Sequence, residues 1–126
     1  MTLLPPPVQS PRIPLWVVAA WPSMKSMRRA LRCDGILPVK MNADRSFATV
    51  TPSDIREIKA FIDKQRTATT PFDIVIEGVT PGDNPEVMKA QLQPYAEAGM
   101  TWWIESMWGS EQHEVFRRIQ QGPPCL

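Results

Sequence analysis

The sequence is poor in cysteine and histidine and has almost no net charge, and each shortage excludes a class of protein. Two cysteines, Cys33 and Cys125, stand far apart at no metal-binding spacing, which is typical of a protein of the reducing cytoplasm rather than a disulfide-stabilised scaffold. The single histidine, His113, has no second imidazole with which to share a metal. Basic and acidic residues number 14 and 13, so no overall field favours nucleic acid or an anionic membrane.

Long apolar runs and nucleotide-binding or hydrolase motifs are also missing. A membrane-spanning helix needs roughly 18 consecutive apolar residues, and no such run occurs. Residues 1–7 have neither the basic start nor the apolar stretch of a secretory leader. No Walker loop and no Gly-x-Ser-x-Gly elbow is present. We therefore expect a soluble, cytoplasmic protein with no nucleic-acid or membrane partner.

Proline, in contrast, is abundant. The chain has 14 prolines in 126 residues, well above the average usage of ~5%. Five of them lie within residues 5–14, and proline both fixes φ and removes a backbone donor. Residues 1–14 are therefore predicted to be an extended N-terminal segment, and residues 15–126 to be the folded domain.

Residues 15–126 contain four short apolar runs, each followed by a segment with helical signals. The strands are expected at residues 15–20, 35–39, 72–77 and 101–105. The helix N-caps are expected at Ser23, Thr51, Asn84 and Ser110. The final helix is expected to turn an apolar face inward, formed by Val115, Phe116 and Ile119.

Two of these helices have clear boundary signals. Thr51, Pro52 and Asp54 form a variant capping box, with Asp54 in the place of the usual Glu or Gln. In the next helix, Pro94 is expected to kink or split the helix and Gly99 to end it.

The alternation of strands and helices predicts a parallel sheet covered by helices. A complete (β/α)₈ barrel needs ~250 residues, so four strand–helix units correspond to about half of one. A flavodoxin-like sheet is the rival fold at this length, but it usually needs a fifth strand and a Gly-rich phosphate loop after the first strand. The sequence has neither, so we predict an α/β half-barrel of four parallel strand–helix units.

Two acidic residues stand at the predicted carboxyl ends of neighbouring strands, where α/β barrels place their active sites. Side-chain alternation is expected to put Glu77 and Glu105 together on the inward face. There the two carboxylates could bind a polar substrate group or share a proton. Alternatively, each pairs with a basic residue or a backbone amide and only stabilises the rim.

The tryptophans allow two interpretations. Trp21 and Trp108 follow the first and fourth strands and either wall a flat aromatic ligand or cover the core. The layer between the sheet and the helices is expected to contain Ile74, Ile76, Ile104, Trp16 and Trp102.

Five segments resemble the luciferase-like (LLM class) flavin-dependent oxidoreductases. In chain order they read PPVQSPRIPLWVVAAWP (6–22), RRALRCDG (28–35), PFDIVIEG (71–78), YAEAGMTWWIE (95–105) and RIQQGPP (118–124). In that family such segments belong to the last four strand–helix units. The resemblance therefore implies the C-terminal half of a TIM-like barrel, without the N-terminal half that supplies much of the flavin-ring and substrate pocket.

The resemblance further implies a flavin-dependent monooxygenase or oxidoreductase, with FMN or a deazaflavin as cofactor and NAD(P)H as a candidate reductant. Backbone amides after the first two strands would hold the flavin phosphate, at Ala19, Ala20, Trp21, Pro38 and Val39. Family members often have glycine where this chain has Ala19 and Ala20, and alanine restricts close approach of a phosphate. The substrate or rim candidates are Glu77, Gly78, Trp103, Glu105 and Trp108.

A second function class remains open at this stage. Four parallel strands leave two unpaired edges, and such edges favour pairing with another chain. The chain would then be a non-catalytic fragment or an assembly module. The partner would be a second copy, giving a homo-oligomer, or a separate N-terminal half-barrel.

Overall fold

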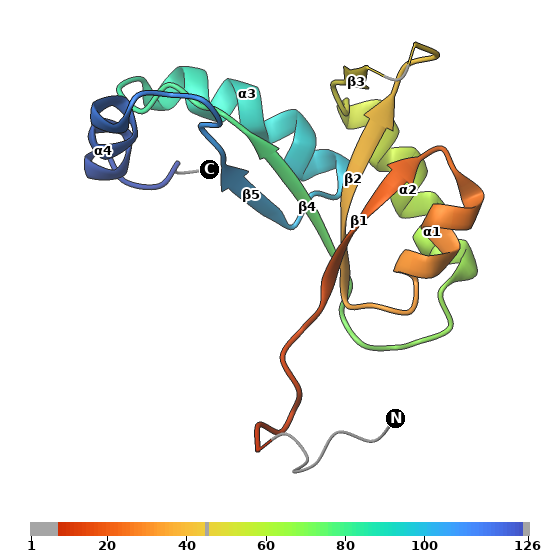
Figure 1. Cartoon of the computed structure of the whole chain (residues 1–126). Coiled ribbons are helices and arrows are strands. Elements are labelled where there is room, and N and C mark those ends of the chain that lie inside the picture. Colours follow the sequence, from red (N-terminus) through yellow and green to blue (C-terminus); the bar gives the residue numbers. More distant parts are fainter. Residues whose placement is uncertain (1–7, 45, 125–126) are drawn as a thin grey trace.

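The computed structural model describes residues 8–44 and 46–124, which form a mostly parallel five-stranded sheet with four helices (Figure 1). The strands are β1 (Trp16–Trp21), β2 (Gly35–Met41), β3 (Phe47–Ala48), β4 (Asp73–Gly78) and β5 (Trp102–Glu105). The helices are α1 (Met24–Ala30), α2 (Pro52–Gln65), α3 (Pro85–Ala98) and α4 (Gln112–Gln120). The predicted alternation of strand and helix is confirmed.

The four main strands lie in the order β1-β2-β4-β5 and all run parallel. The short strand β3 was not predicted. It pairs antiparallel with the end of β2, through Lys40 with Ala48 and Met41 with Phe47. A tight reversal closes this pair, since the Asn42 amide donates to the Ser46 carbonyl at 2.9 Å. Strand β2 consequently extends two residues beyond the predicted end at Val39.

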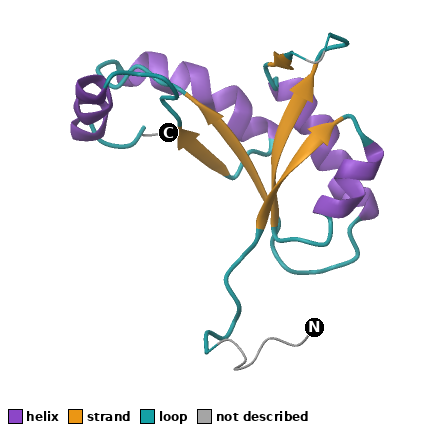
Figure 2. Cartoon of the chain, viewed as in Figure 1, coloured by secondary structure: helices purple, strands orange, loops and turns teal. Residues whose placement is uncertain are grey.

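Helices α1, α2 and α3 pack on the same face of the sheet (Figure 2). One buried cluster joins residues of all three helices to β1, β2 and β4, with Met27, Ile58 and Ala98 as representatives of the helices. Sequential strand order with helices on one face is the pattern of a singly wound sheet, in which each crossover is made in the same direction. The opposite face carries no helix of the described chain.

Strands β2 and β4 are paired only at their N-terminal ends. Two residue pairs join them, Gly35 with Asp73 and Ile36 with Ile74, and the strands then diverge (Figure 1). At Gly35 the backbone is crowded, because an added Cβ would lie 2.6 Å from Trp16 Cδ1 and 2.9 Å from Asp73 Cβ. The sheet is thus tight at the N-terminal ends of its strands and open at their carboxyl ends.

The boundary signals of α2 and α3 are largely confirmed. Thr51 caps α2, and a reciprocal capping box joins it to Asp54. Helix α3 begins after Asn84 and ends at Gly99, whose φ of 113° lies in the left-handed region that glycine tolerates. Of the predicted kink or split at Pro94, the split is wrong, because the helix continues through Pro94 to Ala98.

The start of α4 differs from the prediction. Its N-cap is Glu111 instead of Ser110, and a capping box joins Glu111 to Glu114. Ser110 instead belongs to the preceding turn, where its amide donates to the Met107 carbonyl at 3.2 Å. The residue just before it, Gly109, has a φ of 80°. Ser110 therefore lies in the turn that precedes the helix and does not cap it.

The N-terminal segment is exposed from residue 8 to residue 15 and contains no helix or strand. It is attached to the sheet through Asp34, which accepts two hydrogen bonds from Arg12 and one from the Leu15 amide. The remainder of the predicted segment, residues 1–7, lies outside the described residues, as does Cys125. None of the described helices has both the length and the apolar character needed to cross a membrane.

Candidate functional site

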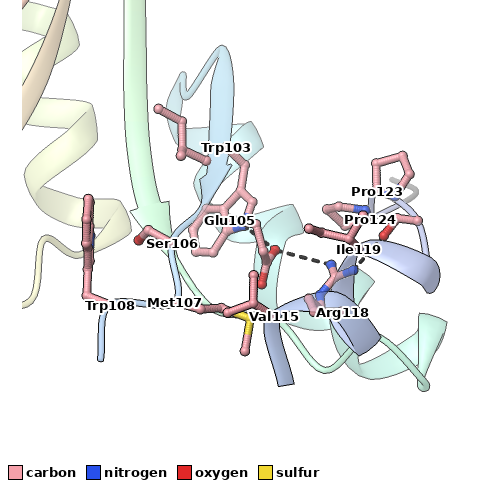
Figure 3. Close-up of a pocket in the computed structure, with 12 residues that line it drawn as sticks. Trp103, Glu105, Ser106, Met107, Trp108, Val115, Arg118, Ile119, Pro123 and Pro124 are labelled. Atoms are coloured by element: carbon pink, nitrogen blue, oxygen red, sulfur yellow. Dashed lines mark hydrogen bonds and ion pairs between the residues drawn. The ribbon is translucent and has the colours of Figure 1, made fainter. Parts of the chain in front are cut away.

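A cavity of about 640 Å³ lies beyond the carboxyl end of β5, between that strand, the loop after it and α4 (Figure 3). The residues that follow α4, Gly122 to Pro124, complete its wall. The volume falls within the ~300–1,000 Å³ that small-molecule sites occupy. The cavity is therefore large enough for a cofactor ring or a small organic substrate.

An ion pair forms the polar floor of this cavity. Arg118 Nη2 lies 3.2 Å from Glu105 Oε2, and the same nitrogen donates to the Thr80 hydroxyl at 3.0 Å. Glu105 also accepts hydrogen bonds from the Thr80 amide, the Thr80 hydroxyl and the Trp103 indole N–H. Both carboxylate oxygens thus accept from donors of the chain itself, Oε1 from the Thr80 amide and Oε2 from the other three donors.

These contacts set the ionisation of Glu105. Burial alone would raise the pKa of its carboxyl, but the hydrogen bonds from the Thr80 amide, the Trp103 indole and the Thr80 hydroxyl outweigh burial. With the charge of Arg118, they hold the pKa of Glu105 below its ordinary value of 4.5. Glu105 is therefore a carboxylate at neutral pH and is poorly suited to act as a general acid.

Arg118 is the inward-facing residue of α4, contrary to the prediction for this helix. Its relative exposure is 7%, whereas Phe116 and Ile119 are 56% and 67% exposed. Val115 is half-buried and lines the cavity. The guanidinium also donates to the Gly122 carbonyl, so it joins β5, the loop after β4 and the end of α4. The helix therefore turns Arg118, and not most of its apolar stripe, toward β5 and the loop after β4.

The rim of the cavity is apolar and open to solvent. Trp108 is 86% exposed, and Ile119 lies on the other side of the Glu105–Arg118 pair (Figure 3). Met107 and Ile104 add further apolar wall. The sequence left open whether Trp108 covers the core or walls a ligand, and its exposure excludes a core-covering role.

A second cavity, of about 500 Å³, fills the gap where β2 and β4 diverge. Pro38 and Val39 line it from β2, and Glu77, Gly78 and Trp103 from β4 and β5. An added Cβ at Gly78 would lie 2.4 Å from Trp103 Cη2, so the glycine makes room for the indole. Five of the ten predicted site residues therefore line this cavity, at the carboxyl end of the sheet where β2 and β4 have separated.

The expectation that Glu77 and Glu105 share the inward face is wrong. In the register between β4 and β5, Gly78 lies opposite Glu105 and Glu77 lies opposite Ile104. Glu105 is consequently on the helix side with Trp103, while Glu77 is exposed on the face without helices. Glu77 makes no hydrogen bond or ion pair within the described residues. The two carboxylates cannot share a proton in this arrangement.

The tryptophans are also distributed differently from the expectation. Trp16 and Trp102 do not pack between the sheet and the helices; their rings meet at 5.5 Å on the opposite face, and Trp102 is 52% exposed. The same register places Ile104 on that face, whereas Ile74 and Ile76 do belong to the helix-facing core. Trp21 is buried against Phe61 in that core, with ring centroids 6.5 Å apart, so it does not wall a ligand.

The residues expected to hold a flavin phosphate do not form a set of free donors. The Ala20 amide donates to the Ser26 hydroxyl at 3.0 Å. Pro38 has no amide hydrogen, and the neighbouring Lys40 donates to the Asp54 carboxylate at 2.7 Å. Ala19 and Trp21 point their side chains into the core. Ala20 and Pro38 therefore offer a phosphate no free backbone N–H in the single chain.

Sequence reasoning missed Arg118 and Tyr95, which line the two cavities, and Thr80, which contacts the Glu105–Arg118 pair. Tyr95 donates its hydroxyl to the Val50 carbonyl at 3.2 Å and packs edge-on against Trp103. Thr80 is 2% exposed. In the sequence, Arg118 is a basic residue one turn after Glu114, within an otherwise apolar stripe. Such a residue ordinarily lies on the solvated face of a helix, so nothing in the sequence indicated its buried position.

Comparisons with protein-family models, with curated proteins and with solved structures returned no match for this chain. Within the described residues, no cluster of three or more His, Cys, Asp or Glu side chains is placed to hold a metal ion.

Proposed function

We propose that this chain is one half of a TIM-like barrel, of the luciferase-like flavin-dependent type, and that a second copy of the chain supplies the other half. The completed barrel would bind FMN or a deazaflavin at its carboxyl rim and act as an oxidoreductase or monooxygenase. The pairing follows from the geometry of the sheet. The flavin follows from the resemblance of residues 6–22 and the later segments to that family.

The face of the sheet without helices is the observation that carries the pairing. It exposes apolar side chains that a soluble sheet normally covers, including Val18 at 54% and Trp102 at 52%. Strands β1 and β5 are the two edges of the parallel path, and neither edge has a further partner in the described chain. Parallel sheets occur almost only with both faces covered.

A second copy fits this surface by symmetry. All four main strands run in one direction, so a two-fold axis along the strands brings β5 of one copy beside β1 of the other in parallel. Two such contacts close eight strands, the number of a TIM-like barrel. The formal net charge of +1 per chain gives little repulsion between copies.

Two of the five residues expected to hold the phosphate, Ala20 and Pro38, offer no free backbone N–H. Further donors for a phosphate would come from another segment of the paired barrel. The contribution of this chain to a bound flavin would be an apolar wall for the uncharged ring system in the two rim cavities, with Trp103 common to both. A flavin performs the redox chemistry itself, while the protein positions it and excludes water.

The test measures the mass of the purified chain by analytical ultracentrifugation and titrates the same sample with FMN, following flavin fluorescence. A dimer that binds FMN saturably supports both parts. A dimer without FMN binding overturns the flavin part and leaves a non-catalytic assembly module. A monomer overturns the pairing, whether or not it binds FMN.

A matched pair of variants locates the interface. Val18→Arg places a charge on the face without helices, and Val87→Arg places the same charge on the outer surface of α3, where Val87 is 48% exposed. The pairing predicts that only Val18→Arg raises the dimer dissociation constant. We expect an increase of tenfold or more, which corresponds to a loss of about 1.4 kcal/mol or more of binding free energy. Equal effects of the two variants would contradict the proposed interface.

A further inference from the structure

We propose that the cavity between β5 and α4 binds a neutral, flat, largely apolar small molecule. This inference concerns the single chain and does not depend on barrel pairing or on a flavin. It rests on three features of the cavity: its apolar wall, its internally compensated charges and an exposed tryptophan at its rim (Figure 3).

The wall of the cavity determines the shape and polarity of the ligand. Apolar residues contribute most of it, including Met107, Val115 and Ile119. Met107 is an adaptable wall, since its unbranched thioether can follow the outline of different ligands. Small-molecule sites usually combine such an apolar lining with a few placed polar groups, and here the polar groups are at the floor.

The polar floor excludes a charged ligand. Glu105 already accepts from Thr80, Trp103 and Arg118. The two terminal nitrogens of the Arg118 guanidinium donate to Glu105, Thr80 and the Gly122 carbonyl, while its Nε is buried and has no hydrogen-bond partner among the described residues. The charge of the guanidinium is balanced by Glu105, although one of its N–H groups is unpaired. An anionic ligand would have to displace Glu105 from the buried cation, and a cationic ligand would have to displace Arg118 from the carboxylate. Each exchange leaves a buried charge without its partner, which is strongly unfavourable, so a neutral ligand is favoured.

Trp108 indicates a flat ligand. Its indole is 86% exposed, although burial of a large aromatic ring is one of the strongest apolar contributions a side chain can make. The ring stands across the rim from Ile119, itself 67% exposed (Figure 3). Figure 3 shows Trp103, Ser106 and Glu105 between these two side chains. A flat aromatic molecule in the cavity would therefore contact the exposed face of Trp108 alone, in the offset or edge-on arrangement that aromatic rings prefer.

The test uses two fluorescent probes that differ in one charged group. N-phenylnaphthylamine is neutral and has two flat aromatic groups, and anilinonaphthalene sulfonate has the same rings with an added sulfonate. We expect saturable binding of the neutral probe to the full chain with one site per chain, and binding of the sulfonate at least tenfold weaker. Equal or tighter binding of the sulfonate would overturn the neutral-ligand inference, because Arg118 would then be accessible to anions.

Two exposed aromatic residues provide matched variants. Trp108→Ala removes the ring at this rim, and Phe47→Ala removes a ring that is 78% exposed and lines the cavity between β2 and β4 instead. We expect Trp108→Ala to weaken binding of the neutral probe about tenfold, the effect of one lost aromatic contact. Phe47→Ala should leave binding unchanged. The opposite result would place the ligand in the other cavity and overturn the proposal.

Measurement of the oligomeric mass checks separately whether a small molecule or a second copy of the chain occupies this rim. Because Trp108 is almost fully exposed, its removal should not unfold the chain, and circular dichroism and the urea midpoint of the variant verify this. If Trp108→Ala changes the oligomeric mass and not the probe affinity, the rim is an interface between copies of the chain, and the small-molecule inference is wrong.

Discussion

Replacement of Glu105 by glutamine tests the network that joins β5, α4 and the loop after β4. Glutamine keeps the shape of the side chain but replaces one carboxylate oxygen by an NH₂ group, which is a donor. Donors already surround both oxygens: the Thr80 amide at Oε1, and the Thr80 hydroxyl, the Trp103 indole and Arg118 at Oε2. Either orientation of the new amide therefore sets a donor against a donor.

The magnitude follows from the least costly orientation, in which the NH₂ group faces the Thr80 amide alone. This loses one hydrogen bond to a charged acceptor, worth about 1.5–3 kcal/mol. It also leaves Arg118, 7% exposed, without its counter-charge. We expect Glu105→Gln to lower the free energy of unfolding by about 3 kcal/mol at neutral pH. With a urea slope of roughly 2 kcal/mol per molar, the unfolding midpoint falls by about 1.5 M.

The pH dependence separates a charge effect from a packing effect. The folded pKa of Glu105 lies below its ordinary value of 4.5, so the unfolded chain takes up this proton more readily as pH falls. The carboxylate therefore stabilises the fold fully above that ordinary value, and the stabilisation is lost as pH falls through the folded pKa. The difference between the wild-type protein and Glu105→Gln should be full near neutral pH and shrink progressively in acid.

Urea unfolding followed by tryptophan fluorescence, from about pH 7 to about pH 3, measures this difference. Glu77→Gln is the control, because Glu77 lies near the end of the neighbouring strand β4 but is exposed and makes no hydrogen bond or ion pair within the described residues. It should change stability by less than about 0.5 kcal/mol. The reasoning is refuted if Glu105→Gln is as stable as Glu77→Gln at neutral pH, or if its deficit is the same in acid.

Two further variants test the local structure that positions the cavities. Gly35→Ala should lower stability by about 1–3 kcal/mol, because its Cβ would meet Trp16 and Asp73 at 2.6 and 2.9 Å; thermal unfolding measures the loss, and an unchanged midpoint would show that the N-terminal end of the sheet can expand. Thr51→Ala should cost about 1 kcal/mol by removing the N-cap of α2. Thr51→Ser should retain most of that stability in the same assay, and equal losses would mean that the cap hydroxyl contributes little.

The sequence by itself determined the elements and several of their ends. Short apolar runs between proline and glycine marked the four main strands, and the helices between them followed from local signals. The Thr51–Asp54 capping box and the left-handed stop at Gly99 are both present, because each depends on residues within one turn of the chain. The two-residue strand β3 carried no comparable signal, since it exists only through its pairing with the end of β2.

Only the tertiary structure decided which side chains meet. Alternation along a strand groups Trp103 with Glu105, but a one-residue change in register between strands moves every side chain to the other face, and Gly78 lies opposite Glu105. This register separates Glu77 from Glu105. The partner of Glu105 is instead Arg118 on α4, where the apolar pattern favoured Phe116 and Ile119. Local pattern could not identify that contact, because it depends on where a carboxylate from another element lies beneath the helix.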